Sequence, residues 1–203
     1  MISGLTYESV GEPVGAAVPL ELRKAQMTDI VPLLTLINGY AGKGIMLPRT
    51  EFEISENIRD FSVAYAGEKL AGCGALHFYT PILGEVRSLA VDESLKSHGV
   101  GRRIVEMLVA EAQAYELDAV FAFTYVAEFF RRMGFEEVER GELPLKAWKD
   151  CLRCPKFQCC DEIAMVRVLR PQHWEQARPG LGATPLPPFE GDGLVLLPKI
   201  GKL

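Results

Sequence analysis

The chain has 203 residues, 48% of them hydrophobic, which is enough to bury one substantial core and favours a single domain with extensions over two domains. Its formal net charge of -5 argues against nonspecific nucleic-acid binding, because such binding needs a concentrated basic face. No apolar run is long enough to span a bilayer, and the first residues do not form a basic region followed by an apolar one. We therefore expect a cytoplasmic protein with neither nucleic acid nor a membrane as its partner.

Glycine and proline divide the chain into three parts. Residues 1–19 contain several of both with weak periodicity, and are expected to form an N-terminal extension. The folded domain is expected at 20–170. Residues 171–203 are expected to form a Pro/Gly-rich tail that is irregular from Gln172 onward. Because the tail contains an apolar run near its end, it could dock on the domain or on a second subunit, which leaves a homodimer open.

In the first half of the domain, the sequence pattern predicts two helices and the first strands of a sheet. Thr28 is a typical N-cap for the first helix, and Gly67-Glu68 fits a hairpin turn between two strands. The expected strands are 20–23, 61–65 and 69–78, and the expected helices are 29–38 and 51–59, joined by a loop over 39–48.

A strand over 85–91 runs into a helix that starts at glycines. Gly99 and Gly101 remove side chains where a phosphate must approach backbone N–H groups, and the helix that follows offers unpaired amides and a partial positive charge. This helix is predicted over 101–114, because apolar residues recur there at steps of three and four. Lysine and arginine side chains nearby add positive charge. The segment therefore predicts a site for a ligand that carries a pyrophosphate.

Two other phosphate-binding motifs fit this segment less well. A dinucleotide fingerprint would need a small residue where Ile104 stands, and a P-loop would continue from Gly101 with Lys-Ser/Thr instead of Arg102-Arg103. The pattern that remains is a basic or amide residue, two residues, Gly, one residue, and then Gly or Ala, which Lys96 to Gly101 satisfies. It resembles the acetyl-CoA loop of the GNAT superfamily of N-acetyltransferases.

The resemblance continues beyond the loop. A buried strand over 118–124 precedes a short helix over 127–133 that ends in Gly134-Phe135, as in the second block of the superfamily. Further strands are expected near 135–139 and 162–169. The resemblance implies an α/β GNAT fold, in which a mixed central sheet is flanked by helices and the acetyl-CoA loop lies between the fourth strand and the third helix. Acetyl-CoA is then the cosubstrate, and the chemistry requires no metal.

By the same resemblance, the loop binds the pyrophosphate of acetyl-CoA and the preceding strand edge pairs with the pantetheine arm. Backbone amides of that edge would also polarise the thioester carbonyl. His98 is expected to line the loop, and His77 to be a residue of the sheet. The implied acetyl-CoA contacts are Leu89, Ala90, Val91, Lys96, Ser97, His98, Gly99, Val100, Gly101, Arg102 and Phe129.

One branch of the superfamily is similar over about 22–169, namely the short single-domain N-acetylglutamate synthases of bacterial arginine biosynthesis. The motifs that carry the similarity include Ile45 to Thr50, Glu85 to Val91, and Trp148 to Cys151. The implied activity is acetyl transfer to the α-amine of L-glutamate, the first step of arginine biosynthesis.

Glutamate has two carboxylates, so its site must provide fixed positive charge. The resemblance assigns Arg49 to the substrate, since a planar guanidinium can bind a carboxylate through two parallel hydrogen bonds. Arg87 and Lys149 are the candidates for the second carboxylate.

Acetyl transfer also needs a neutral amine, so a base must remove a proton from the ammonium group. Glu85, on the central strand, is the candidate general base. The superfamily often uses a Tyr of the short helix to protonate the departing thiolate, but the matching position after Phe129 is Phe130. Tyr125 is the candidate to replace it, and otherwise the thiolate leaves unaided, because a thiol pKa of about 8.5 makes it a tolerable leaving group.

Four cysteines lie within ten residues of one another: Cys151, Cys154, Cys159 and Cys160. The spacing permits a structural zinc site, reduced thiols that pack, or redox sensing. Zinc is not favoured, because adjacent Cys159 and Cys160 coordinate one ion awkwardly and a cytosolic setting favours reduced thiols.

Three classes of function remain open at this point. The first is acetyl-CoA:L-glutamate N-acetyltransferase. The second is a GNAT enzyme for another amine, such as a different amino acid, a polyamine or a protein N-terminus. The third is a catalytically weak regulatory module that binds acyl-CoA or metal, which the cysteines and Phe130 suggest.

Overall fold

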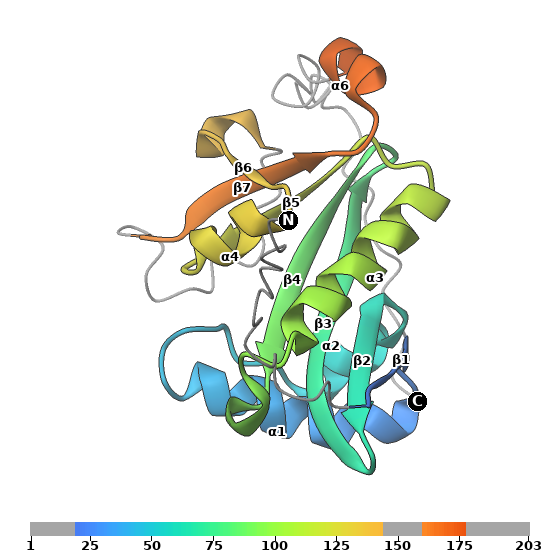
Figure 1. Cartoon of the computed structure of the whole chain (residues 1–203), viewed down its shortest axis with the longest axis vertical. Coiled ribbons are helices and arrows are strands. Elements are labelled where there is room, and N and C mark those ends of the chain that lie inside the picture. Colours follow the sequence, from blue (N-terminus) through green and yellow to red (C-terminus); the bar gives the residue numbers. More distant parts are fainter. Residues whose placement is uncertain (1–18, 144–159, 178–203) are drawn as a thin grey trace, which may run out of the picture.

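The computed structural model describes residues 19–143 and 160–177 (Figure 1). The described residues form a mixed seven-stranded sheet in the order β1-β2-β3-β4-β5-β7-β6. The strands are β1 (Glu21–Lys24), β2 (Phe61–Ala66), β3 (Lys69–Thr80), β4 (Leu83–Val91), β5 (Ala119–Thr124), β6 (Glu136–Glu137) and β7 (Ile163–Val168). The α-helices are α1 (Ile30–Ala41), α2 (Glu51–Glu56), α3 (Val100–Ala114), α4 (Ala127–Arg132) and α6 (Pro171–Ala177). Short 3-10 turns are η1 (Met27–Asp29), η2 (Ile58–Asp60), η3 (Glu93–Leu95) and η4 (Arg140–Glu142).

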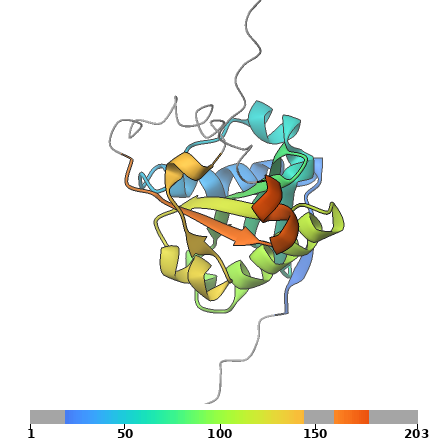
Figure 2. The same cartoon turned by 90° about the horizontal axis from the view of Figure 1, so that it is seen from above.

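The sheet is antiparallel from β1 through β4, and β4 then pairs parallel with β5. A parallel pair needs a crossover connection, which α3 provides. Helices α1 and α2 lie on one face of the sheet and α3 and α4 on the other (Figure 2). The predicted GNAT-type arrangement, a mixed sheet flanked by helices with the glycine loop between the fourth strand and the third helix, is confirmed.

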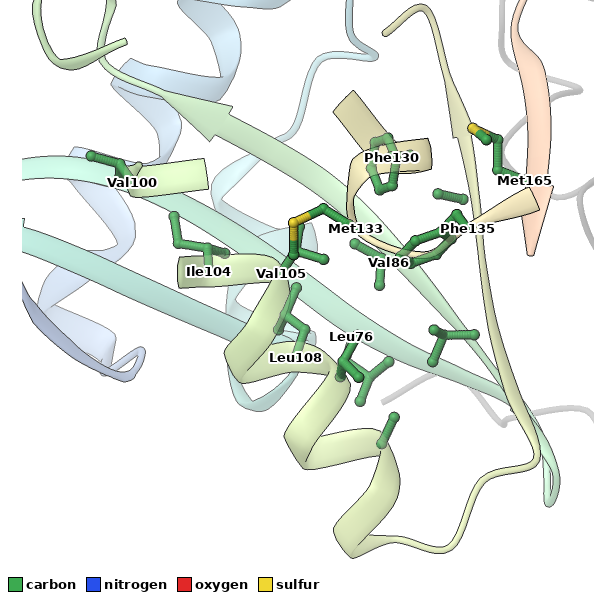
Figure 3. Close-up of a cluster of buried hydrophobic side chains, with 14 of the residues drawn as sticks. Leu76, Val86, Val100, Ile104, Val105, Leu108, Phe130, Met133, Phe135 and Met165 are labelled. Atoms are coloured by element: carbon green, nitrogen blue, oxygen red, sulfur yellow. The ribbon is translucent and has the colours of Figure 1, made fainter. Parts of the chain in front are cut away.

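Helix α3 packs closely on the sheet because β3 presents glycines beneath it. Its apolar residues Val100, Ile104 and Leu108 are buried and point toward the sheet (Figure 3). A Cβ atom at Gly72 would lie 2.9 Å from the Ala90 backbone oxygen and 2.9 Å from Ile104 Cδ1. The absence of a side chain there therefore sets the distance between helix and sheet.

A buried carboxylate ties the first strand to the sheet and to helix α1. Asp29 is 2% exposed and receives hydrogen bonds from the Arg23 guanidinium at 2.6 and 2.9 Å, the Tyr65 hydroxyl at 2.8 Å and the Gln26 amide at 2.7 Å. The Arg23 hydrogen bond is the largest of the effects that lower the pKa of Asp29 from 3.8 to about 2. The charged carboxylate is thus the form that the fold stabilises.

Several local predictions are wrong. Thr28 is not the N-cap of α1, because it lies inside η1 and Asp29 takes that position. The helix expected over 51–59 ends at Glu56 and is followed by η2. The irregular chain expected from Gln172 is instead helical through Ala177, and Trp174 of this helix is buried against the sheet.

The remaining expected elements lie where the pattern placed them, except that the strand expected over 135–139 contains only Glu136–Glu137. None of the helices among the described residues combines the length and apolar character needed to cross a bilayer. The limits of the extension and of the tail stay predictions.

The first prediction concerns helix packing. Gly72→Ala should lower the free energy of unfolding by about 1 to 3 kcal/mol, because the new methyl group overlaps a backbone oxygen that cannot move aside cheaply. Gly39→Ala is the control, since a Cβ at this α1 position meets nothing within 4 Å and Ala is the better helix former. Urea denaturation measures both. Equal stability of the Gly72→Ala variant and the wild type would show that helix and sheet are not in tight contact there.

The second prediction concerns pH. The folded pKa of Asp29 is depressed, so its stabilisation is complete above the unfolded pKa near 4 and is lost as the pH falls toward 2. The free energy of unfolding should decrease by about 2 kcal/mol across this window from this residue, and Asp29→Asn should remove that decrease. Glu21→Gln, which alters an exposed partner of the same Arg23, should leave the profile unchanged. Identical acid profiles for Asp29→Asn and the wild type would contradict the assignment.

Candidate active site

Strands β4 and β5 separate partway along their length. They pair only through Leu83–Glu85 with Ala119–Phe121, whereas β4 continues to Val91 and β5 to Thr124. Figure 1 shows the two strands diverging toward the end where α3 begins. The edge of β4 that faces β5 therefore lacks a strand partner among the described residues beyond Glu85. Backbone amide and carbonyl groups along such an edge are a template for an extended ligand.

A bulge in β4 lies within this open part. Two residues, Ser88 and Leu89, stand opposite Gly74 between the pairs Ala75 with Arg87 and Cys73 with Ala90. Ser88 has a φ of 52°, a left-handed conformation that is uncommon outside glycine. Bulges bend a strand and redirect the side chains that follow.

The Cys73 thiol supports the bulge from β3. Its Sγ donates to the Ser88 carbonyl oxygen over 3.6 Å, and its complete burial raises the pKa of the thiol to about 12. Cys73 therefore stays a neutral hydrogen-bond donor at neutral pH.

The loop after β4 has the backbone geometry of an anion site. Ser97 and Gly99 both have positive φ, 67° and 76°, and Gly99 is the N-cap of α3 without a side-chain cap. The first amides of α3 have no acceptor within the helix, so they and the helix dipole attract negative charge. A run of left-handed and right-handed residues also turns successive amides to one side. The predicted glycine loop thus has the local structure that a phosphate needs.

The Tyr40 side chain of α1 links this loop to the end of β4. Its hydroxyl donates to the Val91 carbonyl oxygen at 2.6 Å, and Lys96 Nζ lies 5.1 Å from its ring centre. The contact with Tyr40, ahead of the charge of Glu93, raises the pKa of Lys96. Lys43 also binds Glu93, so two lysines and one glutamate leave net positive charge beside the loop.

Arg102, a predicted acetyl-CoA contact, lies on the exposed side of α3, where its Nε is 2.8 Å from Glu106.

Three other predicted acetyl-CoA contacts, Val91, Gly101 and Phe129, lie close together. A Cβ at Gly101 would lie 3.4 Å from Val91 and 3.5 Å from Phe129, so β4, α3 and α4 meet at this point. Phe130 is buried, edge to face with Phe129 and Phe135, and offers no polar group (Figure 3).

The α1 face of the sheet carries a second group of polar residues, on β3, β4 and η2. Side chains alternate along a strand, and Cys73 and Ala75 pack on the α1 side. The same alternation places His77 and Tyr79 there, as well as Glu85 and Arg87 of β4. These four residues, together with Asp60 of η2, are called the polar cluster below.

The polar cluster is held by short contacts. The Tyr79 hydroxyl donates to Glu85 Oε2 at 2.7 Å, and His77 Nδ1 lies 2.5 Å from Asp60 Oδ2. Arg87 Nη2 is 3.7 Å from the same Asp60 oxygen, and its side chain is 14% exposed. Glu85, the predicted base, and Arg87, a predicted substrate residue, therefore lie on one face and each has partners within the protein.

Arg49 is fixed on the same side of the sheet by helix α1. The Asn38 side chain donates from Nδ2 to the Arg49 carbonyl and accepts from the Arg49 amide through Oδ1, both at 2.9 Å. Thr50 then caps α2 through the Glu53 amide. The backbone of Arg49 is thus anchored at a helix start, although sequence patterns gave no sign that Asn38 would do this.

Tyr125 follows β5 directly and is 37% exposed, at the end of the strand where β4 and β5 have separated. Lys149 and three of the four clustered cysteines, Cys151, Cys154 and Cys159, lie outside the described residues. Cys160 is described, and Arg140 Nη2 lies 3.1 Å from its sulfur. Among the described residues no group of three or more His, Cys, Asp or Glu side chains could hold a metal ion.

Comparison with known proteins places this geometry in context. A family described as acetyltransferase (GNAT) domain matches residues 57–137. An uncharacterized N-acetyltransferase of Chlorobaculum tepidum is 45% identical over 148 residues, which is 73% of this chain and 96% of the relative. An amino-acid acetyltransferase of Mycobacterium tuberculosis is 39% identical over 135 residues, 65% of this chain and 77% of the relative.

Two solved structures are also similar. A Mycobacterium tuberculosis protein in complex with CoA and a second ligand has a TM-score of 0.64 and 32% identity, covering 73% of this chain and 99% of its own. The N-acetylglutamate synthase of Neisseria gonorrhoeae, complexed with coenzyme A and N-acetyl-glutamate, has a TM-score of 0.68 and 27% identity. The match covers 74% of this chain and 35% of that synthase.

Proposed function

Since the chain belongs to the GNAT family of acetyltransferases, we propose that it transfers the acetyl group of acetyl-CoA to the α-amine of L-glutamate, the reaction of N-acetylglutamate synthases. The observation that carries the proposal is the position of Arg49, anchored through Asn38 on the same side of the sheet as Glu85. Arginine biosynthesis is then the context of the activity.

The donor half of the proposal uses the open edge and the glycine loop. The pyrophosphate of acetyl-CoA would lie against the first amides of α3 and the left-handed turn at Ser97 and Gly99. The pantetheine arm would pair with the unpaired edge at Leu89 to Val91 and pass Phe129. Because the Val91 carbonyl already accepts from Tyr40, the remaining groups of that edge would make these hydrogen bonds.

In the acceptor half, the Arg49 guanidinium binds one carboxylate of glutamate. Arg87 is the one candidate for the other carboxylate among the described residues, but it shares its charge with Asp60 at 3.7 Å. This pairing favours a second candidate function, transfer to an amino acid whose side chain is uncharged. A polyamine fits poorly, because Arg49 and Arg87 would repel it.

Glu85 acts as general base in this proposal. Its carboxylate takes the proton of the ammonium group, directly or through a water molecule, so that the neutral amine can attack the thioester carbon. Tyr79 donates to Glu85 Oε2 at 2.7 Å and thereby fixes the orientation of the carboxylate. Tyr125 protonates the leaving thiolate, since the buried ring of Phe130 has no proton to give.

The third prediction tests the acceptor. Purified protein is incubated with acetyl-CoA and equal amounts of glutamate, glutamine, aspartate, lysine and spermidine, and the products are identified by mass spectrometry. N-acetylglutamate should dominate, because two carboxylates meet two arginines. Dominant N-acetylglutamine would support the second candidate, and an acetylated polyamine would contradict both.

The fourth prediction separates the two half-sites. Arg49→Ala should raise the KM for glutamate about 10-fold to 100-fold and leave the KM for acetyl-CoA nearly unchanged, because it removes a charged hydrogen-bond donor. Gly99→Val should do the reverse, since Val in a left-handed conformation deforms the loop. Gly67→Val is the matched control, because Gly67 has a φ of 60° in the hairpin turn between β2 and β3 and is not among the residues proposed to bind either substrate. It should cost stability and change neither KM, and equal effects of all three variants would refute the division.

A further inference from the structure

Acetylation of an amine releases a proton. The ammonium group loses two protons in becoming an amide, and one of them replaces the proton that Tyr125 gives to the thiolate of CoA. One proton per turnover must therefore leave the site. If Glu85 receives it, the carboxylate has to be deprotonated again before the next cycle.

His77 stands directly opposite Glu85 in the sheet register. The two residues are direct partners of the antiparallel pair formed by β3 and β4. Directly opposed residues have Cβ atoms about 4.5 to 5.5 Å apart and point to the same face. The Tyr79 hydroxyl donates to Glu85, and the Tyr79 ring packs edge to face on His77 with centres 5.2 Å apart. Tyr79 thus contacts both side chains.

Asp60 fixes the imidazole from the other side. Its Oδ2 lies 2.5 Å from His77 Nδ1, so the two atoms share a hydrogen bond. Because Nδ1 points to Asp60 of η2, the opposite edge of the ring points away from η2. The side chains of His77 and Asp60 are 23% and 25% exposed. The His77 and Asp60 pair therefore lies beside Glu85 and is partly accessible to solvent.

We propose that His77, held by Asp60, is the proton relay that returns Glu85 to its carboxylate form after each turnover. The proton on Glu85 moves to the neutral imidazole, directly or through one water molecule, and the imidazolium is stabilised by the Asp60 carboxylate. The imidazolium then loses a proton to water or buffer, so that one proton leaves and no other bond changes. The proposal rests on Glu85 being the base in the proposed function.

The charged and titratable groups around His77 agree with this role. Asp60 of η2 and Glu85 of β4 are acidic and favour the transient imidazolium, whereas Arg87 of β4 opposes it and lies 3.7 Å from Asp60. Tyr79 of β3 packs on the imidazole, and Lys24 of β1 donates to the Asp60 carbonyl oxygen at 3.3 Å. A merely structural histidine would need the hydrogen bond to Asp60 but no exchange of protons. The two roles therefore differ in what a non-titrating replacement does.

The test, which is the fifth prediction, replaces His77 by Gln, which can accept or donate a hydrogen bond but cannot carry the proton. At saturating substrates the kcat of His77→Gln should fall about 10-fold to 100-fold, with both KM values and the thermal midpoint nearly unchanged. Added imidazole should restore much of the loss. Asp60→Asn, which retains the imidazole, should give a smaller loss of kcat and a changed pH–rate profile.

The chain provides a matched control in a second Asp and His pair. His173 Nδ1 of α6 lies 3.2 Å from Asp118, which precedes β5 at the end opposite Tyr125. His173→Gln should leave kcat, both KM values and the response to imidazole as in the wild type.

Unchanged kcat in His77→Gln would overturn the relay, and so would a loss that imidazole does not relieve. A wild type that acetylates a different amine would refute the proposed acceptor alone, and the same comparison on that amine would still decide the relay. If the wild type acetylates glutamate but His77→Gln keeps the wild-type kcat, the relay is refuted and the proposed function is not affected.

Discussion

The rest of the structure depends on the incomplete pairing of β4 with β5. The two strands hydrogen-bond only near Glu85 and Phe121, and beyond that point each continues without the other. The bulge at Ser88, with Cys73 bonded to its carbonyl, bends β4 just where the pairing has ended. A sheet closed along its whole length would satisfy its own backbone groups and leave no edge for an extended ligand.

Helix α3 makes this opening compatible with a stable core. It crosses from β4 to β5 and packs on β3 at Gly72 and Gly74. One face of the sheet is therefore covered by α3 in the region where β4 and β5 separate. The same close packing fixes the N-terminus of α3 beside the open edge. At Gly72 and Gly74 the helix rests on the backbone of β3, which yields less than side chains would. One contact thus serves the stability of the domain and the position of its anion-binding amides.

The two faces of the sheet differ in character at the open end. The start of α3 presents backbone amides, and Lys43 and Lys96 add positive charge beside it, which suits a phosphate. The α1 side presents the polar cluster, in which Asp60 contacts both His77 and Arg87, and Tyr79 contacts Glu85. Because Asp60 lies 3.7 Å from Arg87, an acceptor has to compete with Asp60 for that arginine. In the proposed reaction this competition is what separates acceptors with charged side chains from neutral ones.

The sequence by itself determined the family, the glycine loop and the order of strands and helices, because left-handed turns, helix starts and apolar periodicity are local properties of the chain. It missed the N-cap of α1, since Asp29 is drawn into a bond with Arg23 and Tyr65 that no local pattern reveals. It proposed Glu85, Arg49 and Arg87 by resemblance, and their catalytic and binding roles stay predictions. Only the tertiary structure decided that Asn38 anchors Arg49 and that Asp60 joins His77 to Arg87, because these contacts link residues that are 11 to 27 positions apart in the chain.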